Sequence, residues 1–564
     1  MGEISIRGKI GQCFTVRFLD AVITPETLIA INKLNCGGLR LVPWERVGLK
    51  YQKGQDRNFH GGQVEGDEPK RTGSAIYALP TEYAGILNKL QEMAISRPGG
   101  VPLHFSIDQE GDFYGDFNRG GVSFFPSQMG LTAANDPKLT DEIFYSIGRQ
   151  LKSIGIHFLH SPVLDVNVNP KNSEIGTRSF SDDPEKVAKM GLIALKALRR
   201  AGVCAVAKHF PGRGNSEQDA HYETVYYPSN RTEMEEIDLL PYRRLIKEGL
   251  KSIMVAHTIY PALGDAKNPA SVSWDIVTGL LRQEMKFDGI VTTDSITMRG
   301  LMDKFGLTRA CIMALKGGCD LILYRGPVGE LVKVVDEMEE AVKLGILPIK
   351  TVEAALERVY RFKKETGIFE NPFADLSKIE AVIHDKKIKS VASDAPYKTA
   401  QFIRKRKTPS LNCEQNILVV EQLSRYAWQC NDLHFHPGIL FECIMSEGDP
   451  YRIKTVETAW QGDEKDRKRV CDIIDWADVV VATALHDRCV PGNIEFLRWL
   501  HKQNKPLVII TNSPYSCAEL DFAETLLLNF ASGREGLSAS VKILFGQKEP
   551  YGKWPLKNWR LMSA

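Results

Sequence analysis

Between about residues 30 and 330 the sequence repeats one pattern: a short apolar run rich in β-branched residues, then polar residues, then a helical period. This alternation predicts parallel β/α units, because a parallel strand needs a crossover connection to return to the same edge of the sheet. Seven or eight strands over this length favour a (β/α)8 TIM-type barrel over an open dinucleotide-binding sheet, and no GxGxxG motif follows the first run. The seven runs lie at 37–43, 101–108, 156–166, 203–210, 252–261, 289–294 and 320–326.

A second α/β pattern follows the first. Its apolar runs at 416–422, 478–485, 506–513 and 525–530 predict a flavodoxin-like α/β/α sandwich. A chain of 564 residues is too long to fold around a single hydrophobic core, so at least two domains are expected. The sequence therefore predicts a TIM-barrel domain at residues 1–374, a linker at 375–412 and a sandwich domain at 413–564.

Composition and charge narrow the class of protein. With 43% hydrophobic and 25% charged residues and a net charge of +2, the chain is typical of globular proteins and offers no global attraction to nucleic acid. Its 11 cysteines are dispersed and form no CxxC pair, which argues against a disulfide framework and a structural zinc site. The N-terminus lacks the apolar run of a secretory signal and no 18-residue apolar segment follows, so we expect a cytoplasmic protein without a membrane partner, either a monomer or a homodimer.

Polar, chemically capable side chains stand where five of the predicted barrel strands end. In barrels of this kind the C-terminal strand ends build the active site. At any single strand the polar residue is equally explained as the start of a loop, but five strands together favour a site. The residues are Asp108, Asp165, Lys208 with His209, His257 and Asp294.

The loop that follows the motif KHFPGRG at 208–214 presents Asp219 and His221. A carboxylate two residues from an imidazole accepts its N–H, fixes its tautomer and raises its basicity, which suits a proton-transfer catalyst. An isolated Asp-x-His is also common as plain surface polarity. Zinc ligation with His209 is a third interpretation, although the neighbouring Lys208 would repel a cation.

Asp294 ends the strand-like run GIVTTD. In a cleft lined by Lys208 and Arg178, its carboxylate would stay ionised at neutral pH and be able to attack an anomeric carbon. A helical pattern follows Asp294, so a helix N-cap is the structural alternative.

These motifs together resemble glycoside hydrolase family 3, and more narrowly its β-N-acetylglucosaminidase branch. The resemblance extends over residues 8–370 in the family's order, and the tail 544–557 looks like the end of that family's α/β accessory domain. It is carried by IDQEG (107–111), SPVLDVNVNP with IGTRSF (161–180), KHFPGRG with the downstream Asp-x-His (208–221), and GIVTTD (289–294).

The resemblance implies a retaining exo-glycosidase of carbohydrate metabolism that requires neither a metal nor a cofactor. Asp294 would be the nucleophile, His221 the general acid and then base, and Asp219 its dyad partner. The implied reaction is a double displacement that releases terminal β-linked N-acetylglucosamine, or a related hexosamine, from a small saccharide or glycoconjugate such as a chitooligosaccharide or muropeptide fragment. The expected sugar-binding residues are Asp108, Arg178, Lys208, His209 and the strand-end His257.

The segment Asp112–Asp116 departs from the family pattern, because arginines are expected after IDQEG. Asp116 stands where the resemblance places a sugar-contacting arginine. Either Arg119 or the polar stretch 54–73 supplies the missing cation, or the substrate differs from simple N-acetylglucosaminides. Three alternatives therefore remain: a glycosidase of altered sugar specificity, a sugar-binding homologue without catalysis, and a β-N-acetylglucosaminide phosphorylase, because a histidine acid does not repel phosphate.

Overall fold

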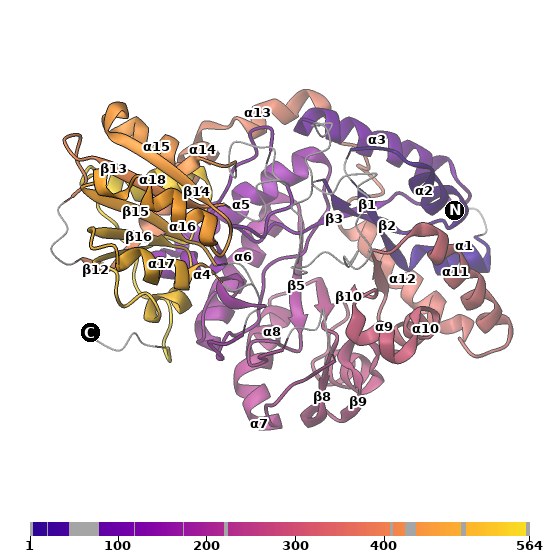
Figure 1. The fold of residues 1–564 in the computed structure, drawn as a ribbon. Helices are drawn as coiled ribbons and strands as arrows, with labels where there is room; N and C mark the ends of the chain where they lie inside the picture. The colour runs from indigo at the N-terminus through magenta and orange to yellow at the C-terminus, as the bar shows by residue number, and fades with distance from the viewer. Residues whose placement is uncertain are drawn as a thin grey trace.

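The computed structural model describes residues 4–19, 21–43, 78–117, 119–172, 174–218, 224–405, 410–423, 436–486 and 492–559. These residues form a closed parallel barrel and a separate α/β sandwich, which lie side by side in Figure 1. The predicted fold class is therefore confirmed.

In the described residues, eight parallel strands close the barrel. Each of the seven predicted runs overlaps one of them, and the eighth precedes the first run. In their order around the barrel they are β1 (Phe14–Leu19), β11 (Leu321–Tyr324), β10 (Ile290–Ser295), β7 (Ser252–Val255), β5 (Cys204–Phe210), β4 (Phe158–Leu159), β3 (His104–Ile107) and β2 (Gly38–Val42).

Helices surround this barrel (Figure 1). Two of the longest begin and end on the same local signals. In α5 (Pro137–Ile154) and α6 (Pro184–Ala201), an aspartate caps the first backbone N–H groups, proline occupies the first turn, and a left-handed glycine ends the helix. The other α- and π-helices around the barrel are α1 (Ile6–Gln12), α2 (Pro25–Leu28), η1 (Ile29–Lys33), α3 (Pro80–Ser96), α4 (Gln128–Ala134), α7 (Arg231–Glu233), η3 (Met234–Asp238), α8 (Leu239–Lys247), η6 (Asp275–Glu284), α9 (Arg299–Phe305), α10 (Leu307–Gly317), α11 (Val328–Lys343) and α12 (Ile349–Glu365). Short 3-10 helices are η2 (Gly176–Arg178), η4 (Pro261–Leu263) and η5 (Ala270–Val272).

A small side sheet lies beside the barrel strands. Its strands β6 (Val225–Tyr226), β8 (Thr258–Tyr260) and β9 (Asp265–Pro269) come from the connections that follow β5 and β7. The chain that carries the predicted Asp-x-His loop enters this sheet at β6.

The sandwich contains a six-stranded sheet. Its five parallel strands, taken along the chain, have the spatial order 2-1-3-4-5 of flavodoxin-like sheets, and one antiparallel strand is added at the edge. The sheet order is β12 (Gln401–Lys405), β17 (Thr525–Leu528), β16 (Leu507–Thr511), β15 (Val479–Ala484), β13 (Ile417–Gln422) and β14 (Ile453–Thr458). The helices α15 (Ile439–Glu447), α16 (Glu464–Cys471), α17 (Ile494–His501) and α18 (Arg534–Leu544) cover it.

Alternate residues of β13 enter two different cores of the sandwich. Leu418 and Val420 belong to the core that includes Phe496 of α17, whereas Ile417 and Val419 belong to the core that includes helices α15 and α18. A central parallel strand buried on both faces reads as a continuous apolar run, which explains why the sequence signal was clear.

The segment 375–412, which the sequence assigns to a linker, contains regular structure. It holds α13 (Ile379–Ile383), which packs on α5, and α14 (Lys386–Thr399), which packs on α5, α4 and α18. Its last strand, β12, pairs with β17 of the sandwich sheet. The connection is thus built into both parts of the molecule.

Residues 555–559, which follow the sandwich, contact the barrel. The buried carboxylate of Asp182 accepts hydrogen bonds from the backbone N–H groups of Lys557, Asn558 and Trp559, at 2.7, 2.7 and 3.1 Å. Ser181 adds a bond from its hydroxyl to the Pro555 carbonyl at 2.9 Å. These contacts dock the second domain on the barrel through a charged group rather than by apolar packing alone.

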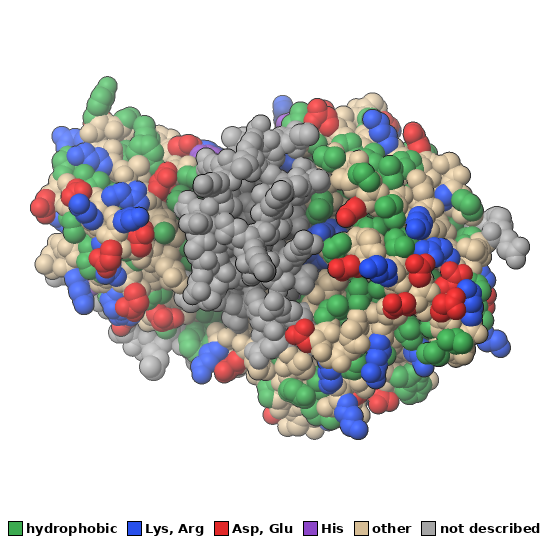
Figure 2. Space-filling view, turned by 45° about the vertical axis from the view of Figure 1, so that its right-hand side comes forward, with side chains coloured by type: hydrophobic (Ala, Val, Ile, Leu, Met, Phe, Trp, Pro, Cys, Tyr) green, Lys and Arg blue, Asp and Glu red, His purple; other side chains and the backbone are tan. Residues whose placement is uncertain are grey.

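The surface in Figure 2 shows acidic and basic side chains interspersed on the described parts of both domains. Among the described residues, no helix is long and apolar enough to cross a membrane.

A buried ion pair cluster closes the N-terminal end of the barrel. Asp320, fully buried just before β11, accepts hydrogen bonds from Arg282 Nη2 at 2.7 Å, Arg358 Nε at 2.6 Å and the Val291 N–H at 2.8 Å. This cluster joins strands β10 and β11 to η6 and α12, at the barrel face that serves stability rather than catalysis.

We expect Asp320→Ala to destabilise the barrel strongly. Removing one partner of a buried ion pair leaves the others uncompensated and costs about 3–5 kcal/mol. Calorimetric melting of the variant should show a lower melting temperature for the barrel transition. As a control, Asp336→Ala, which breaks an exposed pair with Arg7, should leave the melting temperature nearly unchanged. Equal melting temperatures for Asp320→Ala and the parent protein would contradict this account.

Candidate active site

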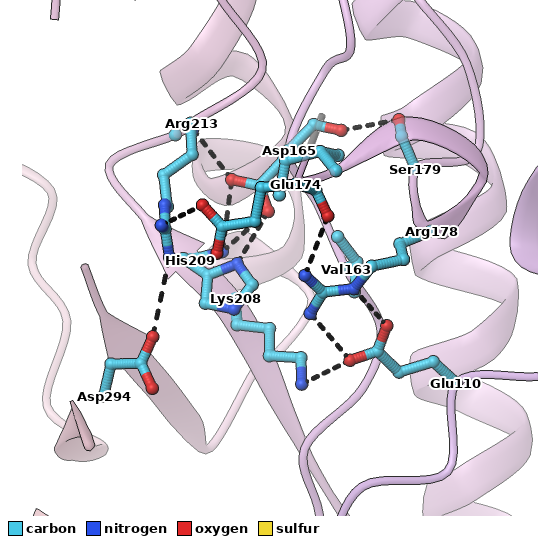
Figure 3. Close-up of polar contacts among 12 residues, drawn as sticks. Glu110, Val163, Asp165, Glu174, Arg178, Ser179, Lys208, His209, Arg213 and Asp294 are labelled. Carbon is cyan, nitrogen blue, oxygen red and sulfur yellow. Dashed lines mark hydrogen bonds and ion pairs between the residues drawn. The ribbon is translucent and has the colours of Figure 1, made fainter. Parts of the chain in front are cut away.

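Glu110 is the centre of a buried charge cluster at the C-terminal end of the barrel (Figure 3). Its carboxylate accepts hydrogen bonds from Arg178 Nε at 2.7 Å and Nη2 at 2.9 Å, and it lies 2.6 Å from Lys208 Nζ. Burial alone would raise the pKa of Glu110, but the charges of Arg178 and Lys208 outweigh burial and lower its pKa to about 2. The ion pairs hold the three side chains in place along one side of the barrel mouth. Two of them, Arg178 and Lys208, are predicted sugar-binding residues.

Asp108, which follows β3, is the most accessible carboxylate of this cluster. Its side chain is 25% exposed, and Oδ1 accepts a hydrogen bond from Lys208 Nζ at 2.8 Å. Oδ2 pairs with Arg40 of β2, and His160 Nδ1 lies 3.3 Å from Oδ1. Burial opposes ionisation, yet Arg40 and Lys208 keep the pKa of Asp108 well below its usual range. An ionised, partly exposed acceptor is thus available to a ligand.

Arg40 is the cation that contacts Asp116. Its Nη2 lies 2.6 Å from the Asp116 carboxylate, which also accepts the Asp108 N–H at 3.0 Å. Arg119, which the sequence offered as a replacement for the missing arginine, donates a hydrogen bond to the Pro43 carbonyl. The stretch 54–73 lies outside the described residues. Arg40 therefore supplies a positive charge to both Asp116 and Asp108, and Lys208 supplies a second one to Asp108.

His209 is held by the fully buried Asp165. Its Nδ1 lies 2.8 Å from Asp165 Oδ2, and its backbone N–H donates to the same carboxylate. Burial lowers the pKa of His209 to about 4, although Asp165 opposes this. Because Nδ1–H of the neutral ring is donated to Asp165, Nε2 is left as a hydrogen-bond acceptor. The peptide bonds before His209 and before Pro211 are both cis.

Asp294, the predicted nucleophile, lies in β10 with a side chain that is 15% exposed. Its Oδ1 accepts the Ser295 N–H at 2.7 Å, and Oδ2 lies 3.6 Å from Arg213 Nη1. Arg213 also pairs with Glu174, so one guanidinium faces two carboxylates (Figure 3). The arrangement holds Asp294 at the barrel mouth as a partly exposed carboxylate, rather than as a plain helix cap.

His257 lies close to Asp294, but both of its ring nitrogens form hydrogen bonds within the protein. Its Nε2 lies 2.9 Å from the Ser295 carbonyl and its Nδ1 lies 2.6 Å from Ser271 Oγ. Burial lowers the pKa of His257, so the neutral ring donates from Nε2 and accepts at Nδ1. This geometry supports the end of β10 beside Asp294, while sugar binding by His257 stays a prediction.

Asp219 and His221 lie outside the described residues. The chain that leads to them is anchored at Asn215, whose backbone N–H donates to the Tyr227 hydroxyl at 3.0 Å. Tyr227 in turn donates to Asp238 at 2.7 Å, and burial raises the pKa of Asp238 to about 8. The carboxyl is therefore mostly protonated at neutral pH, which avoids a buried negative charge beside Tyr227.

The sequence analysis did not predict several charged residues of the site, among them Glu110, Arg213, Glu174 and Arg40. Glu110 lies inside the motif IDQEG and Arg213 inside KHFPGRG. Their closeness in sequence to the predicted residues could have indicated that they belong to the site. Arg40 had a different signal, because it is a lone charge in a strand whose other residues are apolar or glycine. In the described part of the chain, no group of three His, Cys, Asp or Glu side chains is arranged to hold a metal ion.

A parallel barrel whose C-terminal strand ends carry paired charges around accessible carboxylates belongs to the class of TIM-barrel enzymes that act on polar substrates. The chain belongs to glycosyl hydrolase family 3, since the model of that family's N-terminal domain matches residues 75–362.

Among curated proteins, the chain is 32% identical over 303 residues to β-hexosaminidase A of Pseudoalteromonas piscicida, a match that spans 50% of each protein. It is 35% identical over 266 residues to the β-hexosaminidase of Nitrosomonas eutropha, covering 46% of this chain and 75% of that protein. The chain thus spans half the length of one of these relatives and three quarters of the other.

Solved structures with the same fold extend over both domains. A family 3 β-N-acetylglucosaminidase from Paenibacillus sp. FPU-7 has a TM-score of 0.85 at 24% identity and covers 99% of both chains. The β-glucoside phosphorylase BglX has a TM-score of 0.78 at 17% identity and covers 99% of this chain and 95% of that chain. These likenesses bear on the fold.

We expect Arg40→Met to shift the acid sensitivity of the protein. A carboxylate with a depressed pKa contributes stability that is lost as the pH falls through its folded-state pKa. Without Arg40 the pKa of Asp108 rises towards its unfolded-state value, so the variant should be destabilised most at neutral pH and its melting temperature should fall less than that of the parent on acidification. The check is melting temperature measured from about pH 7 down to about pH 3. Arg40→Lys, which keeps the charge, should follow the parent curve closely, and an unchanged acid limb in Arg40→Met would rule out the pairing.

Proposed function

We propose that the protein is a retaining exo-glycosidase that releases terminal β-linked N-acetylglucosamine or a related hexosamine. The observation that carries the proposal is Asp294, a partly exposed carboxylate at the end of β10 that faces Arg213 at the barrel mouth. Membership of family 3 and the curated β-hexosaminidases among its relatives support the reaction class and the sugar.

In the proposed first step, an Asp294 oxygen attacks the anomeric carbon while the bond to the leaving oxygen breaks. His221, oriented by Asp219, donates its proton to that oxygen, which leaves as an alcohol. In the second step water attacks the glycosyl ester of Asp294, His221 takes the water's proton, and the sugar leaves with retained configuration. No step requires a metal or a cofactor.

The charge cluster around Glu110 would bind the terminal sugar. Lys208 and Arg178 are donors and Asp108 is an acceptor, so together they match hydroxyl groups, which both donate and accept. His209 adds an acceptor nitrogen. Because the cations Arg40, Arg178 and Lys208 are each paired with a carboxylate, the pocket suits an uncharged sugar.

The setting of the reaction is part of the same proposal. The sequence favours a cytoplasmic protein, whose substrates would be chitooligosaccharides or muropeptide fragments already inside the cell. The protein would act on them without nucleic acid or membrane partners, as a monomer or a homodimer.

Asp294→Ala should lower kcat for an aryl N-acetyl-β-glucosaminide by at least about 10³-fold, because the covalent route is lost. A 2-deoxy-2-fluoro glycoside should add one glycosyl mass to the parent protein and none to the variant in intact-protein mass spectrometry. The matched control is Asp288→Ala, an exposed aspartate just before the same strand, which should keep parent activity. Turnover near the parent level in Asp294→Ala would refute the assignment.

A panel of aryl glycosides with and without the 2-acetamido group tests the sugar. We expect kcat/KM to favour the acetamido sugar by at least about tenfold, since a site built for a polar substituent discriminates against its absence.

Running the assay in phosphate and quantifying sugar-1-phosphate against free sugar separates a hydrolase from a phosphorylase. Free sugar as the main product supports hydrolysis, and sugar-1-phosphate as the main product would overturn it.

A further inference from the structure

The turn that follows IDQEG is held by the second domain rather than by the barrel alone. Its key residue, Asp112, is 1% exposed and has a positive φ of 48°. Its N–H donates to the Phe125 carbonyl at 2.9 Å, which fixes the turn from the barrel side. A left-handed backbone costs free energy for a residue other than glycine, although aspartate and asparagine tolerate it best.

The Asp112 carboxylate points into the second domain. Oδ1 accepts the Ser532 N–H at 2.7 Å, and Oδ2 accepts the Ser532 hydroxyl at 3.1 Å and the Asn512 side-chain amide at 3.2 Å. Asn512 directly follows β16, and Ser532 lies a few residues after β17. Two loops at the carboxyl ends of sandwich strands therefore bind one barrel carboxylate, 400 and 420 residues away in sequence.

Apolar packing reinforces this contact. Phe113 and Phe124 of the barrel form a small buried cluster with Leu485 and Ala531 of the sandwich, and Trp460 packs against it. The second domain thus contacts the turn in two ways, through hydrogen bonds to the Asp112 carboxylate and through apolar packing around Phe113. A shift of the sandwich loops must move it.

The same turn carries the central carboxylate of the proposed sugar pocket. Glu110 donates its N–H to the Tyr114 carbonyl at 2.7 Å, and the Tyr114 N–H returns to the Gly111 carbonyl at 3.1 Å. The guanidinium of Arg178, the partner of Glu110, lies 5.2 Å from the centre of the Tyr114 ring. The position of Glu110 and the packing of Arg178 both depend on how the turn is held.

We propose that Asp112 is a positioning residue of the sugar-binding site, through which Ser532 and Asn512 of the second domain hold the turn that carries Glu110. Asp112 contacts Ser532 and Asn512 on one side and fixes the Glu110 turn on the other. The inference rests on the proposed function for the identity of the ligand, but not for the mechanical connection. It also assigns a purpose to an acidic residue that departs from the family pattern.

Asp112→Gly tests the connection because glycine keeps the left-handed backbone and removes the carboxylate. We expect KM for 4-nitrophenyl N-acetyl-β-glucosaminide to rise roughly tenfold with a smaller change in kcat, since a charged hydrogen-bond partner of the pocket turn is lost. Ser532→Ala and Asn512→Ala, which each remove one donor, should change KM in the same direction by less. They keep the test available if Asp112→Gly folds poorly.

The matched control is Asp182→Asn. Asp182 also docks the second domain through several hydrogen bonds, but its described carboxylate contacts go to Ser181 and residues 557–559 rather than to the pocket. It should lower the melting temperature while leaving KM within about twofold. If KM rises in all these variants only in proportion to the fall in melting temperature, Asp112 is merely a docking contact and the inference is overturned.

Hydrogen exchange of the peptide that contains residues 108–117 provides a readout independent of the substrate. Asp112→Gly should speed exchange there, and Asp182→Asn should not. A parent protein without glycosidase activity would refute the proposed function while leaving this exchange test intact. Unchanged exchange at 108–117 in Asp112→Gly would refute the mechanical connection itself.

Discussion

The ion pairs that Glu110 makes with Arg178 and Lys208 are the interaction on which the site depends. They join the turn after β3 to the segment before α6, 68 residues away in sequence, and to strand β5. Removing such charges from water is costly, so the cluster persists only because each charge is paired and hydrogen-bonded. The same ion pairs fix the positions of these side chains before a ligand binds, so the binding site is preorganised.

The two sides of the barrel mouth differ in their electrostatics. On one side Asp108, Glu110 and Asp116 are matched by Arg40, Arg178 and Lys208, in keeping with an uncharged part of a ligand. On the other side one guanidinium, Arg213, is shared between Glu174 and Asp294. A carboxylate-rich surrounding at Asp294 is suited to a transition state that develops positive charge on the sugar ring.

The sequence predicted the barrel and the sandwich because both depend on local periodicity and on buried strands that read as apolar runs. It also predicted that polar side chains at the strand ends share one face of the barrel: Asp108 and Lys208 pair there, and Asp294 lies at the same barrel mouth with Arg213 as its partner. It could not predict partners that depend on side-chain direction. His257 stands at a strand end like the others, but its ring turns to Ser271 and the Ser295 carbonyl.

Pairings between distant segments were likewise beyond the sequence. Arg40 reaches Asp116 because β2 and β3 are neighbours in the barrel, and no local pattern shows which side chain crosses between them. The contact of Asp112 with Ser532 spans 420 residues and two domains. Read from sequence alone, both aspartates appeared as losses from a motif, whereas in the structure each has a partner.

The sandwich uses its strand ends in an unusual way for a doubly wound sheet. In such sheets ligands bind in the crevice outside the carboxyl ends of the strands. Here the loops after β16 and β17 hold the Asp112 carboxylate. At the end of β13, Glu421 receives backbone N–H groups at the start of α15, and its burial raises the pKa to about 7. Carboxylates of the protein itself thus occupy two places where an anionic ligand group would bind. The loops at the carboxyl ends of β16 and β17 therefore support the barrel. The hydrogen-bond donors that would bind a cofactor in other doubly wound sheets position the turn that carries Glu110 in this protein.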